Sequence, residues 1–265
     1  MLFASYLLLY IMVFCFGIVI GSFLNVCIYR LPKEESIAKG ASHCMTCGEK
    51  IKKRDLVPIF SWCMLRGKCR NCGAPISPRY TIVEALTGVL FVLVYLWYGF
   101  ERPIIAAITC LLYAALIVVF FMDWDTQLIS TPVVIFIGLL GVAELLLNKF
   151  GEFPVSDVTM KSQIIGIFVI SVPFLLIELF SGGRAMGRGD VYLMAAGGLF
   201  LGVKAVIVAA FIGMVTGSVV GMILKHKTGN SKFAFGPFLS LGIAVAALFG
   251  NFLGDLYLRF SGFIE

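Results

Sequence analysis

Long apolar stretches recur along the whole chain and limit its fold more than any other feature. Eight of them lie near residues 5–28, 81–100, 103–122, 131–148, 162–180, 190–202, 203–224 and 233–258. About 20 apolar residues are needed for a helix to cross the ~30 Å hydrocarbon layer of a membrane. With 60% hydrophobic residues and a mean hydropathy of +1.00, the chain is too apolar for a soluble domain. We therefore predict an all-α polytopic membrane protein with about eight transmembrane helices.

The first apolar stretch resembles a secretory signal peptide only in its position. It lacks a basic segment at its start, and it continues into Gly21-Ser22-Phe23-Leu24-Asn25 without a small-residue cleavage site. We therefore predict that it is a retained transmembrane helix.

The distribution of Lys and Arg predicts the orientation of the helices, because these residues concentrate on the cytoplasmic side of a membrane. Eleven of the 21 Lys and Arg residues lie between the first two stretches, and five more lie in other connections on the same side. This side is therefore predicted to be cytoplasmic, with both termini outside. Basic patches also bind nucleic acid. This one adjoins a membrane helix and is interrupted by cysteines, so we expect membrane lipid and no nucleic acid as partners.

The same pattern predicts three parts: a first helix at 1–29, a cytoplasmic domain at 30–80 and a seven-helix membrane domain at 81–265. The middle part contains two CxxC pairs, Cys44-x2-Cys47 and Cys69-x2-Cys72, with 21 residues between them. Four thiolates at this spacing are typical of a structural Zn²⁺ site, and the metal would supply folding free energy to a domain with little core. Two disulfides are the alternative, but cytoplasmic thiols stay reduced. His43 could replace one thiolate, although a surface position is the simpler interpretation.

Two acids lie at the ends of apolar stretches on the predicted cytoplasmic side. Asp123 ends the third stretch, and Asp190 ends the turn Gly187-Arg188-Gly189-Asp190. An ionisable side chain at membrane depth costs about 2.5–3.5 kcal/mol on insertion scales, so it usually has a function or a partner. The apolar run after Asp190 spans only about 18 Å as a helix. Either that helix continues past Val203, or its start is recessed into the membrane. The glycines at 187 and 189 would let the backbone approach a substrate strand.

Two carboxylates that converge on one water cannot easily both ionise, which leaves one acid and one base. In an aspartic protease, the ionised carboxylate takes a proton from the attacking water and the protonated one donates to the substrate. Transporters also carry membrane acids, and a proton-coupled transporter is therefore an alternative, although no internal repeat is evident. A non-catalytic scaffold with a zinc module is another. The remaining acids in apolar stretches are Glu84, Glu144, Glu178 and Asp255.

Several segments together resemble the type IV prepilin peptidase family, and they cover nearly the whole chain in the family's order. They are Gly21-Ser22-Phe23-Leu24-Asn25-Val26, Tyr29-Arg30-Leu31-Pro32, the CxxC loop, Ser61-Trp62, Arg66-Gly67-Lys68-Cys69, Ile76-Ser77-x-Arg79-Tyr80, Met122-Asp123, Gly187-x-Gly189-Asp190 and Phe235-Gly236-Pro237-Phe238-Leu239. The resemblance implies a GxGD-class membrane aspartic endopeptidase of the bacterial inner membrane. Such enzymes remove the basic leader of type IV prepilins or pseudopilins after a glycine at the cytoplasmic face.

Matched residue by residue, the resemblance implies that Asp123 and Asp190 are catalytic and that Cys44, Cys47, Cys69 and Cys72 bind zinc. Asp125 is the rival for the first role, but the family's acid directly follows an apolar residue, as Asp123 does. Gly187, Gly189 and Glu84 are expected to position the substrate. Family members with the cysteine loop often also methylate the new N-terminus with S-adenosylmethionine. No glycine-rich dinucleotide fingerprint locates a donor site here.

Two positions depart from the family's pattern. Ser130 stands where a proline is common, with Pro132 two residues later, so the loop after Asp123 is expected to differ in shape. Tyr192 stands where a lysine is usual, which removes a cation near Asp190. Leaders of the family's substrates are basic, so we do not expect the strongly positive CxxC loop to attract them by its net charge. We expect this loop to act as a lid or positioning element.

Overall fold

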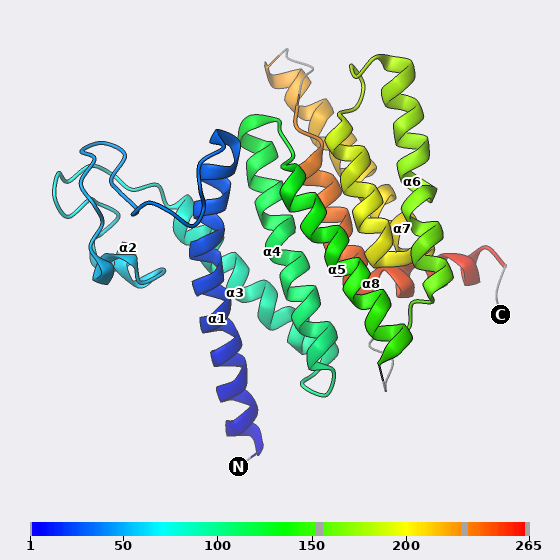
Figure 1. Ribbon diagram of the computed structural model, residues 1–265, viewed down its shortest axis with the longest axis horizontal. Coiled ribbons are helices and arrows are strands. Elements are labelled where there is room, and N and C mark those ends of the chain that lie inside the picture. The colour runs from blue at the N-terminus through cyan, green and yellow to red at the C-terminus, as the bar shows by residue number, and fades with distance from the viewer. Residues whose placement is uncertain (1, 152–155, 229–232, 263–265) are drawn as a thin grey trace. The chain divides into compact units, whose positions relative to one another are not determined.

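The computed structural model describes residues 2–151, 156–228 and 233–262, and they are arranged as helices joined by loops (Figure 1). The chain divides into two compact units, Met1–Leu96 and Trp97–Glu265. The first unit contains α1 (Leu2–Arg30), the 3-10 turns η1 (Leu31–Lys33) and η2 (Lys53–Leu56), the short α2 (Phe60–Met64) and most of α3 (Arg79–Tyr98). The second contains α4 (Pro103–Thr126), α5 (Thr131–Phe150), α6 (Met160–Ser181), α7 (Arg188–Thr228) and α8 (Gly236–Phe260).

Among the described residues, seven helices are long and apolar enough to cross a membrane: α1 and α3 to α8. The prediction of an all-α polytopic membrane protein is therefore confirmed. All eight predicted stretches are helical, but the stretches at 190–202 and 203–224 belong to one element, α7. The two stretches meet at a break in this element, and its halves run in opposite directions along α8: Gly197 faces Ile243, whereas Gly213 and Gly217 face Leu239 and Phe235. The seven elements therefore correspond to the eight predicted stretches.

The two halves of α7 are distinguished by a backbone break at Gly202, where φ is 73° and ψ is 178°. The break removes α-helical geometry at one residue, so the amide of Val203 requires a new acceptor. It donates to the hydroxyl of Ser162 on α6 at 3.0 Å. A Cβ at residue 202 would lie 2.7 Å from this same hydroxyl, so glycine is required both by its φ and by the space. The helix that begins beside Asp190 therefore ends at this break instead of running straight through Val203.

Helices α1 and α3 of the first unit are in close contact because small residues face each other. A Cβ at Gly17 would lie 2.7 Å from the Cα of Gly88, and one at Gly21 would lie 2.7 Å from the Cα of Glu84. Such close approach is typical of glycine-mediated packing between membrane helices. One turn further along, the Asn25 amide donates to the Tyr80 carbonyl at 3.0 Å.

The cytoplasmic loop predicted after α1 is anchored to the helix by Arg30, which is buried. Its guanidinium donates to the carbonyls of Ser36, Lys39 and Gly40 at 2.9, 2.6 and 3.0 Å. The first turn of the loop is therefore fixed to the end of α1.

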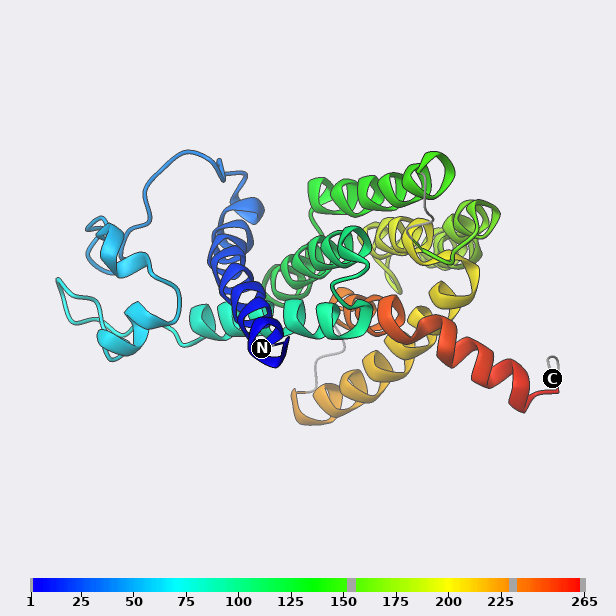
Figure 2. The ribbon, with the colours of Figure 1, turned by 90° about the horizontal axis from the view of Figure 1, so that it is seen from below.

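The second unit is organised around α7, which packs against α5, α6 and α8, while α4 packs against α5 and α8 (Figure 2). Apolar side chains from these helices form one continuous core, with Leu112, Leu193, Leu239 and Ile243 fully buried. This packing brings the end of α4 and the starts of α7 and α8 together at one end of the unit.

Candidate active site and metal centre

Asp123 lies in the last turn of α4 and is only 5% exposed. Its Oδ2 accepts a hydrogen bond of 2.9 Å from the backbone N–H of Gly236, the first residue of α8. The first amides of a helix have no partner within it, and the helix dipole favours negative charge at that end. The start of α8 therefore holds one oxygen of the Asp123 carboxylate in a fixed position.

Asp190 lies in the first turn of α7 and is 7% exposed. Its Oδ2 accepts from the N–H of Gly187, the residue before the helix, at 3.2 Å. This is the reach-back contact by which an acid in a first helical turn caps the helix. The Gly187-Arg188-Gly189-Asp190 turn thus fixes its own carboxylate.

The Ile129 side chain, in the loop between α4 and α5, packs against the starts of both α7 and α8. A Cβ at Gly189 would lie 2.8 Å from the Cβ of Ile129, and a Cβ at Gly236 would lie 3.0 Å from its Cδ1. Both glycines therefore allow the Ile129 side chain to pack between α7 and α8. This packing brings Asp123 and Asp190 close enough to interact electrostatically.

The positions that depart from the family's pattern have clear places in the structure. Ser130 precedes α5, and Pro132 lies in the first turn of that helix, where its missing N–H costs nothing. Tyr192 is 53% exposed. Asp125 is exposed on the last turn of α4, in contrast to the buried Asp123 two residues earlier. Of the two acids, only Asp123 has the buried position next to α8.

Arg188 links the start of α7 to the end of α6. Its Nε donates to Glu178 Oε1 at 3.0 Å, and the Glu178 side chain is largely buried whereas Arg188 is mostly exposed. This contact gives one oxygen of the Glu178 carboxylate a partner. Asp255, another acid named from the sequence, pairs with Lys204 at 2.5 Å.

Glu84 belongs to the first unit and is directed toward the loop between α1 and α3. Its Oε2 accepts from the N–H of Ile59 at 2.7 Å. Ile59 has a φ of 61°, which is a strained conformation for a β-branched residue. Glu84 also lines a cavity of about 690 Å³ within the first unit, together with Asn25 and Trp62. Its predicted role beside the two aspartates stays a prediction.

The four cysteines of the CxxC pairs converge, with their sulfur atoms all within 4.8 Å of one another. The Sγ atoms of Cys44 and Cys72 are 3.9 Å apart. A tetrahedral zinc with Zn–S bonds of about 2.3 Å requires sulfur atoms about 3.8 Å apart. All four thiols are free, as a metal site requires. The donor set therefore fits a Zn²⁺ ion, and His43 is exposed outside this cluster.

The two CxxC segments have the same backbone fold. Cys44 N–H donates to Glu49 and Gly48 N–H donates to Cys44, while Cys69 N–H donates to Ala74 and Gly73 N–H donates to Cys69. The glycines after the second cysteine of each pair have φ values of 70° and 72°. The N–H groups of Cys47 and Thr46 lower the pKa of the Cys44 thiol to about 6. Each segment is thus a preformed turn that presents its thiols to a common point.

Contacts around the cysteines tie the two segments to the rest of the loop. Arg70, between the cysteines of the second pair, forms two hydrogen bonds with Asp55 of η2, at 2.9 and 2.7 Å. The Arg70 guanidinium holds the pKa of the Asp55 carboxyl below its usual range. Asn71 Nδ2 lies 3.9 Å from the Cys47 sulfur and donates to it. The pairing of Arg70 with Asp55 could not be read from the sequence, because charged residues are frequent throughout this loop.

Comparison with known proteins gives a consistent result. The model described as "Bacterial Peptidase A24 N-terminal domain" matches residues 15–98, and the model described as "Type IV leader peptidase family" matches residues 110–222. A prepilin leader peptidase/N-methyltransferase of Neisseria gonorrhoeae is 33% identical over 85% of this chain and 85% of that protein. The Pseudomonas aeruginosa protein of the same name is 30% identical over 93% of this chain and 92% of that protein.

A third relative with this name, from Myxococcus xanthus, is 32% identical over 83% of this chain, which spans 64% of that protein. No solved structure matches the chain. Both matched models describe peptidases, which defines the class of this membrane protein. Within that class, the chain belongs to the type IV leader peptidase family, as its motifs predicted.

Proposed function

We propose that the chain is a membrane aspartic endopeptidase that removes the leader from type IV prepilins or pseudopilins. The observation that carries this proposal is the pair of buried carboxylates, Asp123 and Asp190, held at adjacent helix ends and interacting electrostatically. Relatives that share about 30% identity over most of the chain carry the name prepilin leader peptidase. Together these observations favour the peptidase over a transporter or a scaffold.

In the proposed mechanism, a backbone N–H holds Oδ2 of each carboxylate, so that Oδ1 of each faces the water and the peptide. One carboxylate, ionised, takes a proton from water as it attacks the peptide carbonyl. The other, protonated, donates its proton to the developing oxyanion. The first carboxylate then passes the proton that it took from water to the leaving amine, and the second regains a proton from the hydroxyl as the carbonyl re-forms. Burial of both side chains keeps this proton exchange away from bulk solvent.

The proposal places cleavage after a glycine, at the cytoplasmic face of the bacterial inner membrane, with both termini outside. The prepilin's apolar segment would lie among the helices. Gly187, Gly189 and Glu84 would position the substrate. In this arrangement residues 1–29 form the first helix, 30–80 the zinc domain and 81–265 the peptidase domain.

The decisive experiment is cleavage of a candidate prepilin by the wild-type protein and by Asp123→Asn and Asp190→Asn. Both variants should lose at least about 10³-fold in kcat, because each removes a group that transfers a proton in the transition state. Asp125→Asn is the matched control and should cleave normally, since Asp125 is exposed on the same turn. Normal processing by either of the first two variants, correctly inserted, would reject the assignment.

We also propose that Cys44, Cys47, Cys69 and Cys72 hold a structural Zn²⁺, which would fix the loop in its folded form. Metal analysis of gently purified protein should find about one zinc per chain. Less than that, with intact cysteines, would count against the site.

A second activity, N-methylation of the cleaved product with S-adenosylmethionine, is proposed because the relatives' names include N-methyltransferase. Incubation with prepilin and labelled S-adenosylmethionine tests it. The label should appear on cleaved prepilin, and unlabelled product would remove the claim while leaving the peptidase intact.

A further inference from the structure

A polar cavity of about 410 Å³ lies within the second unit, at the end opposite to the two aspartates. α4 begins at this cavity and carries Asp123 in its last turn. α7 begins at the aspartate end and reaches the cavity at Phe200 and Leu201, just before its break. The peptidase proposal does not use this cavity.

Glu144, on α5, lines the cavity and is only 2% exposed. In the part of the chain that the structure describes, its Oε2 is a buried oxygen without a hydrogen-bond partner. A buried acceptor without a donor costs about 1–3 kcal/mol. A ligand that brings an N–H donor into the cavity would remove this cost.

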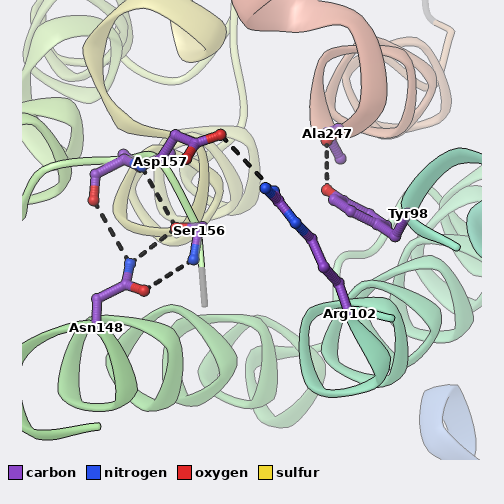
Figure 3. Close-up of polar contacts among 7 residues, drawn as sticks. Tyr98, Arg102, Asn148, Ser156, Asp157 and Ala247 are labelled. Carbon is purple, nitrogen blue, oxygen red and sulfur yellow. Dashed lines mark hydrogen bonds and ion pairs between the residues drawn. The ribbon is translucent and has the colours of Figure 1, made fainter. Parts of the chain in front are cut away.

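Ser156 lies beside the Glu144 carboxyl group. Asn148 fixes it in place, because Asn148 Nδ2 donates to the Ser156 hydroxyl at 2.8 Å and Asn148 Oδ1 accepts from the Ser156 N–H at 2.8 Å (Figure 3). The Ser156 hydroxyl oxygen also accepts from the Val158 N–H at 3.4 Å, so both of its lone pairs are used and its proton is directed to the Glu144 carboxyl group. The acceptor that the depth of the cavity offers is therefore Glu144 Oε2, which an N–H of an ammonium group matches.

Arg102 supplies the opposite charge at the mouth of the cavity. It precedes the first residue of α4, where the helix dipole favours anions. Its guanidinium comes no closer than 3.8 Å to the Asp157 carboxylate, and the two side chains are 58% and 88% exposed (Figure 3). Such an exposed pair contributes little, so the guanidinium can bind a phosphate, for which its geometry is well suited.

Aromatic residues lie between the two charges and at the rim. The Tyr98 hydroxyl donates to the Ala247 carbonyl at 3.2 Å and is within electrostatic reach of both Glu144 and Arg102. Trp97 and Phe252 line the cavity and are exposed on the membrane-spanning helices α3 and α8. Tryptophan and tyrosine are enriched at the level of lipid headgroups, so this rim faces lipid.

We propose that this cavity binds a phosphoethanolamine group, with its ammonium at Glu144, which Ser156 helps to orient, and its phosphate at Arg102 and the start of α4. The exposed aromatic rim identifies the carrier as a phospholipid of the surrounding membrane. The site would select an ethanolamine headgroup over a glycerol headgroup, which has no cation, and over choline, whose methyl groups leave no N–H donor.

Native mass spectrometry of the full chain tests this with phosphatidylethanolamine, phosphatidylglycerol and phosphatidylcholine of identical acyl chains. The wild-type protein should retain phosphatidylethanolamine about fivefold more than either of the others. Glu144→Gln should abolish the preference over phosphatidylcholine, and Arg102→Gln should reduce retention of all three lipids. Glu101→Gln, an exposed acid next to Arg102, is the control and should behave as wild type.

Equal retention of the three lipids by the wild-type protein, or an unchanged preference in Glu144→Gln, would overturn the proposal. If Glu144→Gln does not fold, Ser156→Ala should still weaken the preference, and no change there would also overturn it. Soluble phosphoethanolamine distinguishes the source of the group. If it displaces the lipid, the headgroup alone is recognised; if only the lipid is retained, the acyl chains contribute. None of these measurements requires peptidase activity.

Discussion

Asp123 and Gly236 are 113 residues apart in the chain, yet the carboxylate of one accepts a 2.9 Å hydrogen bond from the backbone N–H of the other. A Cβ at residue 236 would lie 2.7 Å from the same carboxylate oxygen. The Phe235-Gly236-Pro237 segment is therefore part of the aspartate site. Its role is to bring the positive end of α8 against the Asp123 side chain.

This contact predicts that Gly236→Ala is much more harmful to activity than to folding. The added methyl group should displace the Asp123 carboxylate, and a displacement of about 1 Å costs about 10²-fold in rate. Prepilin cleavage should therefore show a reduced kcat with little change in KM. The control is Gly138→Ala, because a Cβ there would meet its nearest atom at an ordinary 4.0 Å. Equal rates for the two variants would contradict the role of Gly236.

The break in α7 predicts a different outcome for Gly202→Ala. Alanine at a φ of 73° is strained, and its methyl group would approach the Ser162 hydroxyl, so we expect a loss of about 1–3 kcal/mol in stability. Ser162→Ala should cost about 1 kcal/mol, because the Val203 amide loses its acceptor. Thermal unfolding in detergent measures both. A Gly202→Ala protein as stable as Gly138→Ala would show that the break is not required.

The proposed zinc site and the Arg70–Asp55 pair, which both stabilise the loop, should respond differently to pH. Zinc binding requires thiolates, so retention of the metal against a chelator should fall as the pH is lowered from 8 to 5. Asp55 behaves differently, because Arg70 holds the pKa of its carboxyl group in the folded protein below the value of about 3.9 in the unfolded chain. Its contribution is complete above about pH 4 and is lost only as the pH falls through the folded pKa.

The difference between wild type and Asp55→Asn should therefore stay constant from pH 8 to 5, while zinc is progressively released. Limited proteolysis of the loop at each pH, with and without added zinc, measures both effects. A wild-type advantage over Asp55→Asn that declines across this range would show that the pair with Arg70 depends on the metal-bound fold.

The sequence was sufficient to predict the features that depend on local pattern. Apolar runs of about 20 residues predicted the membrane helices, and the CxxC spacing predicted the cysteine cluster, whose glycines at 48 and 73 follow each pair. The boundary between the stretches at 190–202 and 203–224 coincides with the break at Gly202. The contact that stabilises the break, with Ser162 on α6, could not be predicted, because it depends on how α6 and α7 pack. The same holds for Ile129, whose contacts with Gly189 and Gly236 depend on how α7 and α8 pack.

The contact of Arg188 with Glu178 predicts a stability effect close to the aspartate site. Arg188→Gln leaves the largely buried Glu178 carboxylate without its 3.0 Å partner, so we expect this variant to unfold at a lower temperature than the wild-type protein. Arg184→Gln is the control, because Arg184 is exposed and its Nε donates only to the Ser181 carbonyl. The double variant Arg188→Gln with Glu178→Gln should recover part of the loss, because it removes the uncompensated charge. Thermal unfolding of the wild-type protein, Arg188→Gln, Glu178→Gln and the double variant completes the cycle. A double variant less stable than Arg188→Gln alone would show that Glu178 has another role.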